Sequence, residues 1–389
     1  MSVARIPFAS VLSRRRARIY GILSTYPPTP CGLATFSAAL ARGLEANGAG
    51  VGIVRVADGL TTLDPRVLGE MDNGVPTSLA EASAVLSGCD VAIVQHDYGL
   101  YGGTDGDEVL DVLADLTVPS IVVAHTVLTE PTDHQRKVLE AVVEAANAVV
   151  VMAQTARRRL CDGYDVDRSK VTTVHHGAAT PGPGYAQDGS GRPMLLTWGL
   201  LGPGKGIEWA IDAMAGLEDM VPRPRYVVAG RTHPKVLSSE GEAYRRMLVA
   251  RARDRGVAAS VTFDSAYRDL GSLTRLVQGA SVVVLPYDSH EQVTSGVLVD
   301  ALAAGRPVVA TAFPHAVELL ASGAGIVVPQ GDASALARAL RRVISEPGLA
   351  ASMEHEAARL APAFAWPAVA SQYIGLADRI LIASKAVPA

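Results

Sequence analysis

VVVLPYDSHEQVTSGVLVDALAAGRPVVAT, residues 282–311, is the stretch that decides the fold class. A valine-rich run ends at Pro286, a polar loop and a helical segment follow, and a second valine-rich run begins after Gly305. Short, nearly continuous apolar runs on either side of a helix are typical of parallel strands that are buried on both faces. The strand–helix–strand order therefore predicts an α/β fold.

The same order recurs along the whole chain in two series. The apolar, strand-like runs of the first series are residues 16–24, 50–57, 90–97, 118–126, 147–153 and 170–177, and those of the second are 193–201, 225–231, 261–264, 281–287, 306–313 and 324–329. A segment rich in Gly, Pro and Ser, residues 178–192, separates them and is the best candidate for a domain linker. We predict two Rossmann-like domains that face an interdomain cleft: residues 1–178, completed by a C-terminal helix over 367–389, and residues 191–366.

Composition narrows the class of protein. The chain has 389 residues, 49% of them hydrophobic, and a formal net charge of −4, which argues against a nucleic-acid-binding surface. No apolar run approaches the roughly 18–20 residues of a membrane-spanning helix. Three widely spaced cysteines without a CxxC pair fit a reducing compartment, so we expect a cytoplasmic protein. The basic tail Arg14–Arg16 is best interpreted as solvated; peripheral contact with anionic lipids is the alternative.

The loop and helix after residue 285 predict an anion site. Thr294 or Ser295 is a good N-cap, and Gly296 beside them leaves the first N–H groups of the helix accessible. Helix N-termini carry partial positive charge and suit a diphosphate. Asp300 lies four residues beyond Gly296, on the same face, where a carboxylate can accept hydrogen bonds from ribose hydroxyls.

A glycine-rich turn, GLLGPGKG, follows the first strand of the second series. Gly199 and Gly204 let the main chain approach a ligand closely. Lys205 stands at the entrance to the next helix, where its ammonium can pair with a phosphate. The turn lacks the ending of a Walker A loop, and by itself it is a weak signal.

Together these motifs resemble the retaining GT-B glycosyltransferases of family 4, and the resemblance covers nearly the whole chain. TYPPTPCGLATFSAAL matches the family's loop after the first strand, with Gly32 at its glycine. GLLGPGKG corresponds to the family's GR…KG loop, and EQVTSGVLVDA to its motif of two carboxylates. Trp366 corresponds to the tryptophan before the crossover helix. The carboxylate region with AAGRPVVAT is the most specific of these matches.

Three positions depart from the family pattern. Leu200 replaces an arginine that binds phosphate in the family, and Asp300 is one methylene shorter than the second glutamate. Eight residues before Asp300 stands Gln292, with Glu291 one position earlier. Either Glu291 or Gln292 takes the role of contacting sugar hydroxyls, and the sequence does not choose between them.

The resemblance also assigns roles elsewhere. His125 corresponds to a histidine that contacts the donor sugar, and with Lys205 and Asp300 it makes up the predicted catalytic set. Asp97 and Tyr98 follow another strand and are weaker candidates for the acceptor side. The donor-binding candidates are Gly32, Gly199, Gly204, Arg231, Tyr267, Glu291, Gln292, Thr294, Ser295 and Gly296. Arg231 is the hypothetical replacement for the missing arginine, and His176 is expected at the hinge without a catalytic role.

The activity that the resemblance implies is transfer of a hexose with retention of configuration. The donor is expected to be GDP-mannose, or alternatively UDP-glucose, and the acceptor a sugar or glycolipid. No cofactor or metal is expected, because the mechanism that the resemblance implies needs no DxD-type metal motif. The alternatives are a catalytically weak nucleotide-sugar-binding partner subunit and a GT-B epimerase. A dehydrogenase is disfavoured because no GxGxxG follows the first strand.

Overall fold

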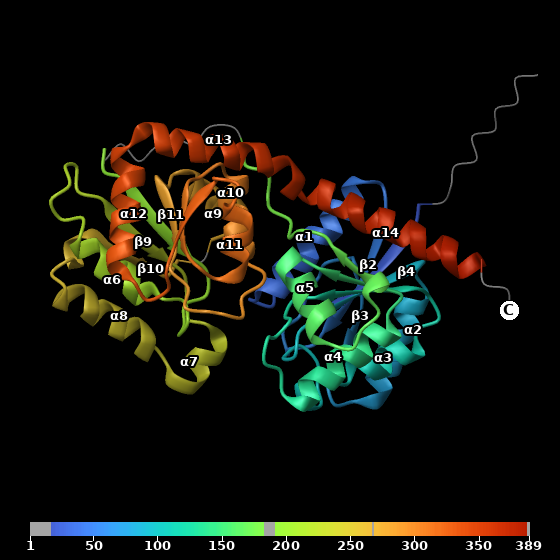
Figure 1. The fold of residues 1–389 in the computed structure, drawn as a ribbon. Helices are drawn as coiled ribbons and strands as arrows, with labels where there is room; N and C mark the ends of the chain where they lie inside the picture. Colours follow the sequence, from blue (N-terminus) through green and yellow to red (C-terminus); the bar gives the residue numbers. More distant parts are fainter. Residues whose placement is uncertain (1–16, 183–190, 267, 387–389) are drawn as a thin grey trace, which may run out of the picture.

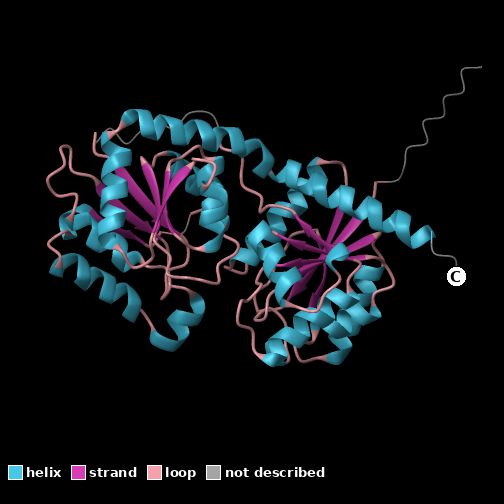
Figure 2. Ribbon diagram, viewed as in Figure 1, coloured by secondary structure: helices cyan, strands magenta, loops and turns pink. Residues whose placement is uncertain are grey.

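The computed structural model describes residues 17–182, 191–266 and 268–386. Two α/β units lie side by side, each with a parallel sheet between layers of helices (Figures 1 and 2). Along the described parts of the chain, no helix combines the length and the apolar character that crossing a membrane requires.

The N-terminal sheet has the strand order β3-β2-β1-β4-β5-β6-β7 within the described residues. Its neighbouring strands pair in parallel throughout. The strands are β1 (Ile19–Ser24), β2 (Gly50–Val56), β3 (Val67–Met71), β4 (Val91–His96), β5 (Ser120–Ala124), β6 (Ala148–Val151) and β7 (Val171–Thr173).

Helices cover both faces of this sheet. The helices that connect its strands are α1 (Gly32–Ala46), α2 (Pro76–Ser87), α3 (Val109–Asp115), α4 (Asp133–Ala145) and α5 (Gln154–Gly163), with short 3-10 helices η1 (Thr104–Gly106) and η2 (Arg168–Lys170). One apolar core lies between the sheet and α1 with the C-terminal helix α14 (Trp366–Ala386), and a second lies under α2 to α5. The fully apolar strands need this two-sided cover.

The C-terminal sheet repeats the design with the order β10-β9-β8-β11-β12-β13 over the described residues. Its strands are β8 (Met194–Trp198), β9 (Arg225–Ala229), β10 (Val261–Asp264), β11 (Val282–Leu285), β12 (Val308–Thr311) and β13 (Gly325–Val328). Its helices are α6 (Ile207–Ala215), α7 (Pro234–Glu240), α8 (Ala243–Asp254), α9 (Leu270–Gln278), α10 (Gly296–Ala303), α11 (Pro314–Leu320), α12 (Ala333–Ser345) and α13 (Pro347–Phe364), with η3 (Ala258–Ser260).

The chain crosses between the units twice. After α13 it returns to the N-terminal unit as α14, which runs along α1 (Figure 1). The approach is close at Gly43, where a Cβ would lie 2.7 Å from the main-chain oxygen of Trp366. The linker that leaves the N-terminal unit is hydrogen-bonded to the end of α13, because the Ala178 N–H donates to the Phe364 carbonyl over 2.7 Å.

The strand order fixes where a ligand can bind. In each sheet the connections reverse direction at one place, between β1 and β4 and between β8 and β11. Ligands of such sheets bind beyond the carboxyl ends of the strands at this switch point. The loops after β8 and β11 are those that contain the glycine-rich turn and the anion-site motif.

The observed architecture confirms the predicted pair of Rossmann-like units with parallel sheets. Strand β3 was not predicted. It is a sheet edge with alternating exposed and part-buried side chains, so it lacks the continuous apolar run of the inner strands.

Candidate active site

The turn after β8 is pressed against the end of β11. Gly199, Gly204 and Gly206 have φ of +117°, +84° and +60°, values that favour glycine because it has no Cβ. A Cβ on Gly206 would lie 1.7 Å from the main-chain oxygen of Pro286. This close approach brings Lys205 to the switch point between the two strands.

Lys205 is half-buried, and its ammonium lies over an aromatic ring. The Nζ atom is 4.4 Å from the ring centroid of Tyr287, the second residue after β11. Burial lowers the pKa of the Lys205 ammonium. Among the described residues no carboxylate forms an ion pair with it. A partly desolvated ammonium of this kind is well prepared to bind an anion.

Tyr287 links this lysine to helix α10, because its ring lies under the Lys205 ammonium and its hydroxyl interacts with the Ser295 side chain. Ser295 is its N-cap, and the Ser295 hydroxyl accepts a hydrogen bond of 3.2 Å from the Leu298 N–H. The Ser295 N–H itself donates to Nδ1 of His315 over 2.8 Å, so it is already engaged. The open donors of the tip therefore begin at Gly296, because the first N–H groups of a helix have no intrahelical partner. The buried Thr294 hydroxyl has no hydrogen-bond partner within the described residues.

The ring of His176 lies against the tip of α10. A Cβ on Gly296 would be 2.8 Å from Cε1 of His176, so a side chain larger than hydrogen does not fit there. Nδ1 of His176 is 2.6 Å from the Gly177 carbonyl oxygen, to which it donates. Burial lowers the pKa of His176 to about 4, so the ring is neutral at pH 7. The residue expected at the hinge thus contacts the predicted diphosphate site.

His125 reaches the same place from the end of β5. The Phe36 ring of α1 is 4.9 Å from the His125 ring and 5.1 Å from each of the rings of His176 and Trp366. Nε2 of His125 is 2.6 Å from Oε1 of Gln95. Burial lowers the pKa of His125 to about 3, so this histidine is also neutral. The fold therefore brings His125 and α10 together around one phenylalanine.

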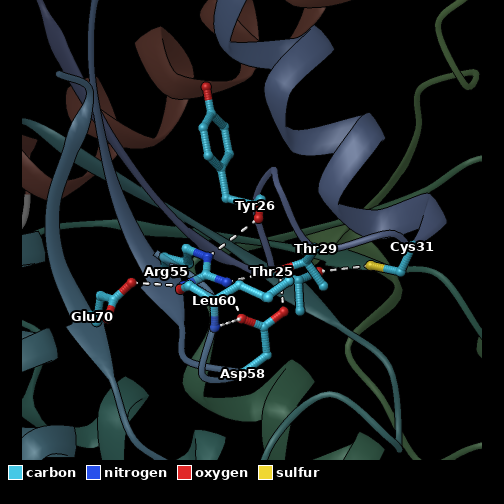
Figure 3. A network of polar contacts seen from close by, with 8 residues as sticks. All are labelled: Thr25, Tyr26, Thr29, Cys31, Arg55, Asp58, Leu60 and Glu70. Carbon is cyan, nitrogen blue, oxygen red and sulfur yellow. Dashed lines mark hydrogen bonds and ion pairs between the residues drawn. The ribbon is translucent and has the colours of Figure 1, made fainter. Parts of the chain in front are cut away.

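Gly32 is the first residue of α1 and is exposed, with no atom within 4 Å of where a Cβ would stand. The loop before it is held by the fully buried Arg55 of β2 (Figure 3). This guanidinium donates to the Tyr26 carbonyl over 3.3 Å and to the Thr29 hydroxyl over 3.1 Å, and it pairs with Glu70 over 2.7 Å. Arg55 thus fixes the course of the loop that leads to Gly32.

Glu291 and Gln292 lie in different surroundings. Oε2 of Glu291 accepts from the Thr129 N–H at 2.8 Å and from Nη1 of Arg159 at 2.9 Å, both in the N-terminal unit. The carboxylate is therefore used in an interdomain contact. The half-buried Gln292 donates through Nε2 to the Thr294 carbonyl at 3.2 Å, which leaves its Oε1 for another partner.

Asp300 lies on α10 and faces a narrow pocket with room for about one water molecule (about 20 Å³). The pocket is bounded by Trp198, by residues of α9, and by Ala179 and Pro181 of the linker. Burial raises the pKa of the Asp300 carboxyl to about 7, and a hydrogen bond from the Ala179 main chain partly offsets this. A ribose needs this pocket to widen.

The remaining candidates come from both units of the chain. Asp97 accepts a hydrogen bond of 2.7 Å from the Thr126 hydroxyl, and Tyr98 meets His96 edge-on with ring centroids 5.4 Å apart. Arg231 is exposed, and its Nε donates to the Ser265 carbonyl over 3.3 Å. Tyr267 lies outside the described residues.

Three residues of this region were missed by the sequence reasoning: Tyr287, His315 and Glu318. His315 and Glu318 lie on α11, which follows β12, and Tyr287 follows β11. All three come after the carboxyl ends of strands, so the switch-point rule could have found them. Their polar groups do not form a recognisable motif, because their partners lie far away in the sequence.

Most of the C-terminal half is similar to a known protein family. Residues 187–360 match the family model described as Glycosyl transferases group 1. This part of the chain is similar to group 1 glycosyltransferases. The match spans the Lys205 turn, the α10 tip and Asp300, the three parts of the candidate site in this half.

Similar full-length proteins carry one name. The D-inositol 3-phosphate glycosyltransferase of Streptomyces avermitilis is 30% identical over 246 residues, which cover 59% of this chain and 51% of that protein. The one of Corynebacterium glutamicum is 27% identical over 285 residues, with 67% and 66% covered. The chain thus spans about half to two thirds of the length of these relatives.

Solved structures share the fold of most of the chain. Anabaena HepE in complex with UDP and glucose superposes with a TM-score of 0.73 at 17% identity, covering 93% of this chain and 100% of that one. Sucrose-phosphate synthase from Thermosynechococcus elongatus gives 0.74 at 19% identity, with 94% and 100% covered. The arrangement of the two units is that of GT-B glycosyltransferases.

Proposed function

We propose that this protein is a glycosyltransferase that moves a hexose from a nucleoside diphosphate to a hydroxyl acceptor. The observation that carries the proposal is the half-buried Lys205 ammonium at the switch point of the C-terminal sheet, which Tyr287 links to the N-terminus of α10 and which no carboxylate of the described residues neutralises. A cation and helix N–H groups directed at one place suit a diphosphate. The group 1 match of this domain supports the same activity.

The donor is proposed to lie along the C-terminal wall. The turn from Gly199 to Gly204 lets the diphosphate approach the main chain, and Lys205 and the Gly296 N–H bind its oxygens. Asp300 would accept the ribose hydroxyls once its pocket opens. Gln292, whose amide oxygen is open, is better placed for the sugar than Glu291, whose carboxylate is taken by Arg159.

For the base and sugar we favour a UDP-linked hexose, with GDP-mannose as the alternative. Similar structures hold UDP or UDP-glucose in Anabaena HepE. The acceptor is proposed to enter from the N-terminal wall, past Asp97 and Tyr98. Because the relatives are named for inositol phosphate, a phosphorylated polyol is a reasonable first acceptor to test besides sugars and glycolipids.

The chemistry proposed is retention of configuration by electrostatic stabilisation of the leaving group. As the glycosidic bond breaks, negative charge develops on the diphosphate, where Lys205 and the helix tip lie. The departing phosphate oxygen then takes the acceptor's proton on the same face. His125 is neutral, so it can hydrogen-bond a sugar hydroxyl without adding a charge near the reacting carbon. No metal is required in this scheme, since Lys205 and the helix supply the positive charge.

The test is a binding panel followed by a variant. Melting temperatures are measured with UDP, GDP and ADP, since a ligand at 100 times its Kd stabilises the native state by about 2.7 kcal/mol. The nucleotide that binds is then titrated into Lys205→Met, with the exposed Lys137→Met of α4 as the matched control. We expect at least a 10-fold loss of affinity in the first and none in the second. No stabilisation by any of the three nucleotides would refute the proposal.

A catalytically weak nucleotide-sugar-binding subunit is the second candidate. It is favoured by Leu200 and Gln292, which replace an arginine and a carboxylate at positions where the resembling family has charged groups. Tight binding of UDP-glucose without release of UDP, in the presence of a panel of sugar and inositol phosphate acceptors, would support it over the enzyme.

A further inference from the structure

Tyr287 lies between the two groups that the proposed function assigns to the diphosphate. Its ring faces the Lys205 ammonium at 4.4 Å from the centroid. Tyr287 is 1% exposed whereas Lys205 is half-buried, so the ring meets the lysine from inside the protein. A ring face attracts a cation because of its quadrupole, and the attraction is strongest when water is excluded.

The other end of Tyr287 reaches α10. The Ser295 side chain interacts with the Tyr287 hydroxyl. Ser295 is also the N-cap that holds the first turn of the helix through the Leu298 N–H. One side chain thus touches the lysine with its ring and the helix cap with its hydroxyl.

The ring itself has little freedom to move. The Phe313 ring lies 5.1 Å from it at an interplanar angle of 31°, and Phe313 is fully buried. The Thr311 hydroxyl donates to the Tyr287 carbonyl over 2.6 Å. Both residues belong to the end of β12 and the loop after it, so the neighbouring strand fixes Tyr287 from behind.

We propose that Tyr287 is a positioning residue that sets the spacing between the Lys205 ammonium and the tip of α10 for recognition of the terminal phosphate of a nucleoside diphosphate. The inference rests on the proposed function. The ring stabilises the ammonium and leaves its positive charge available. A carboxylate in the same place would neutralise that charge. The lysine therefore stays available to a phosphate and is held in place before the ligand arrives.

This role makes a specific demand on nucleotide selectivity. A group that acts through Lys205 affects the phosphate that Lys205 binds, and it leaves the base and ribose contacts unchanged. Removing the ring should lower the affinity for a nucleoside diphosphate and leave the affinity for the monophosphate unchanged. A residue that merely supports the fold would weaken both.

The experiment measures affinities for UDP with UMP, and for GDP with GMP, by calorimetry. Tyr287→Met fills a similar volume without a π face, and Tyr287→Phe keeps the ring. We expect Tyr287→Met to lose about 3- to 10-fold in diphosphate affinity with the monophosphate unchanged, and Tyr287→Phe to lose less. In a Lys205→Met background the Tyr287→Met change should have no further effect. If Tyr287→Met does not fold, fluorinated phenylalanines at 287 weaken the ring face at constant shape and should lower diphosphate affinity progressively.

The possible outcomes distinguish a failure of this inference from a failure of the proposed function. A wild-type chain that binds neither UDP nor GDP refutes the proposed function, and with it the role of Tyr287. Equal losses for di- and monophosphate, or a Tyr287→Met effect that persists without the lysine, overturn the role of Tyr287 while the donor site stands.

Discussion

Glu318 joins the two domains through the start of a helix, and its removal is the perturbation with the clearest consequence. Its two carboxylate oxygens accept from the Gln154 N–H at 2.8 Å and from the Thr155 N–H at 2.7 Å. Both donors belong to the first turn of α5, where a negative charge also interacts favourably with the helix dipole. Because Glu318 lies on α11, the contact exists when the domains are together and is lost when they part.

The size of the effect follows from these two bonds. Hydrogen bonds to a charged group contribute about 1.5–3 kcal/mol each when they are well protected. Glu318 is half-buried, so we use about 1 kcal/mol for each bond, or about 2 kcal/mol in all. Since 1.4 kcal/mol is a factor of ten, Glu318→Ala should lower the ratio of closed to open forms about 30-fold. Glu318→Gln keeps one of the two acceptor oxygens, without its charge, and should lie between.

The assay is small-angle X-ray scattering with and without UDP. We expect a larger radius of gyration for Glu318→Ala, while the affinity for UDP, whose proposed contacts lie within the C-terminal domain, changes less than about twofold. The control is Asp219→Ala, which removes an exposed ion pair with Arg341 inside that domain and should leave the radius unchanged. An unchanged radius in Glu318→Ala would show that other contacts hold the domains together and that our reasoning is wrong.

Three further experiments test the local geometry. Gly206→Ala places a Cβ against a main-chain oxygen at a φ of +60°, so it should lower the free energy of unfolding in urea by about 2–3 kcal/mol; a loss below about 0.5 kcal/mol would contradict the observed approach of the two loops. Burial raises the pKa of Asp300 from 3.8 to about 7, so the native state binds a proton more tightly than the unfolded state does. Proton binding therefore stabilises the native state below pH 4, and this stabilisation is lost as pH rises through 7. Asp300→Asn should therefore melt about 2–4 °C higher than wild type at pH 8 and show no such gain near pH 4; a gain that does not vary with pH would count against the buried carboxyl. Gln292→Ala should lower the affinity for UDP-glucose more than the affinity for UDP, whereas Glu291→Gln should change both affinities equally or not at all. Calorimetry measures these affinities, and the reverse pattern would assign the sugar contact to Glu291.

The parts of the fold that the sequence could predict are those set by local pattern. Valine-rich runs that alternate with helical segments predict parallel strands wherever the strand is buried on both faces, as for β4, β5 and β11. The loops after β8 and β11 could be predicted to meet because topology brings the carboxyl ends of neighbouring strands together. Strand β3 escaped because an edge strand is only partly buried.

The parts of the site that could not be predicted depend on pairings between distant residues. Whether Glu291 or Gln292 faces the cleft depends on Arg159, which lies 132 positions earlier and takes the Glu291 carboxylate. His176 looks like a hinge residue in the sequence, and its contact with Gly296 exists because the linker folds back over α10. No local pattern encodes either contact.

The candidate site combines a charged lysine with several neutral histidines. Four histidines lie at or after the ends of strands near the candidate site, namely the buried His96 and His315 and the half-buried His125 and His176, and desolvation lowers the pKa of each to between about 3 and 4. At pH 7 these side chains offer hydrogen bonds and no charge, whereas Lys205 on the C-terminal wall carries a positive charge. In the proposed function the diphosphate therefore gains its charge interaction from Lys205, whereas His176 and His315 beside the tip of α10 add none. The proposed donor sugar, which is uncharged, is then left to His125, which packs on the same Phe36 ring as His176.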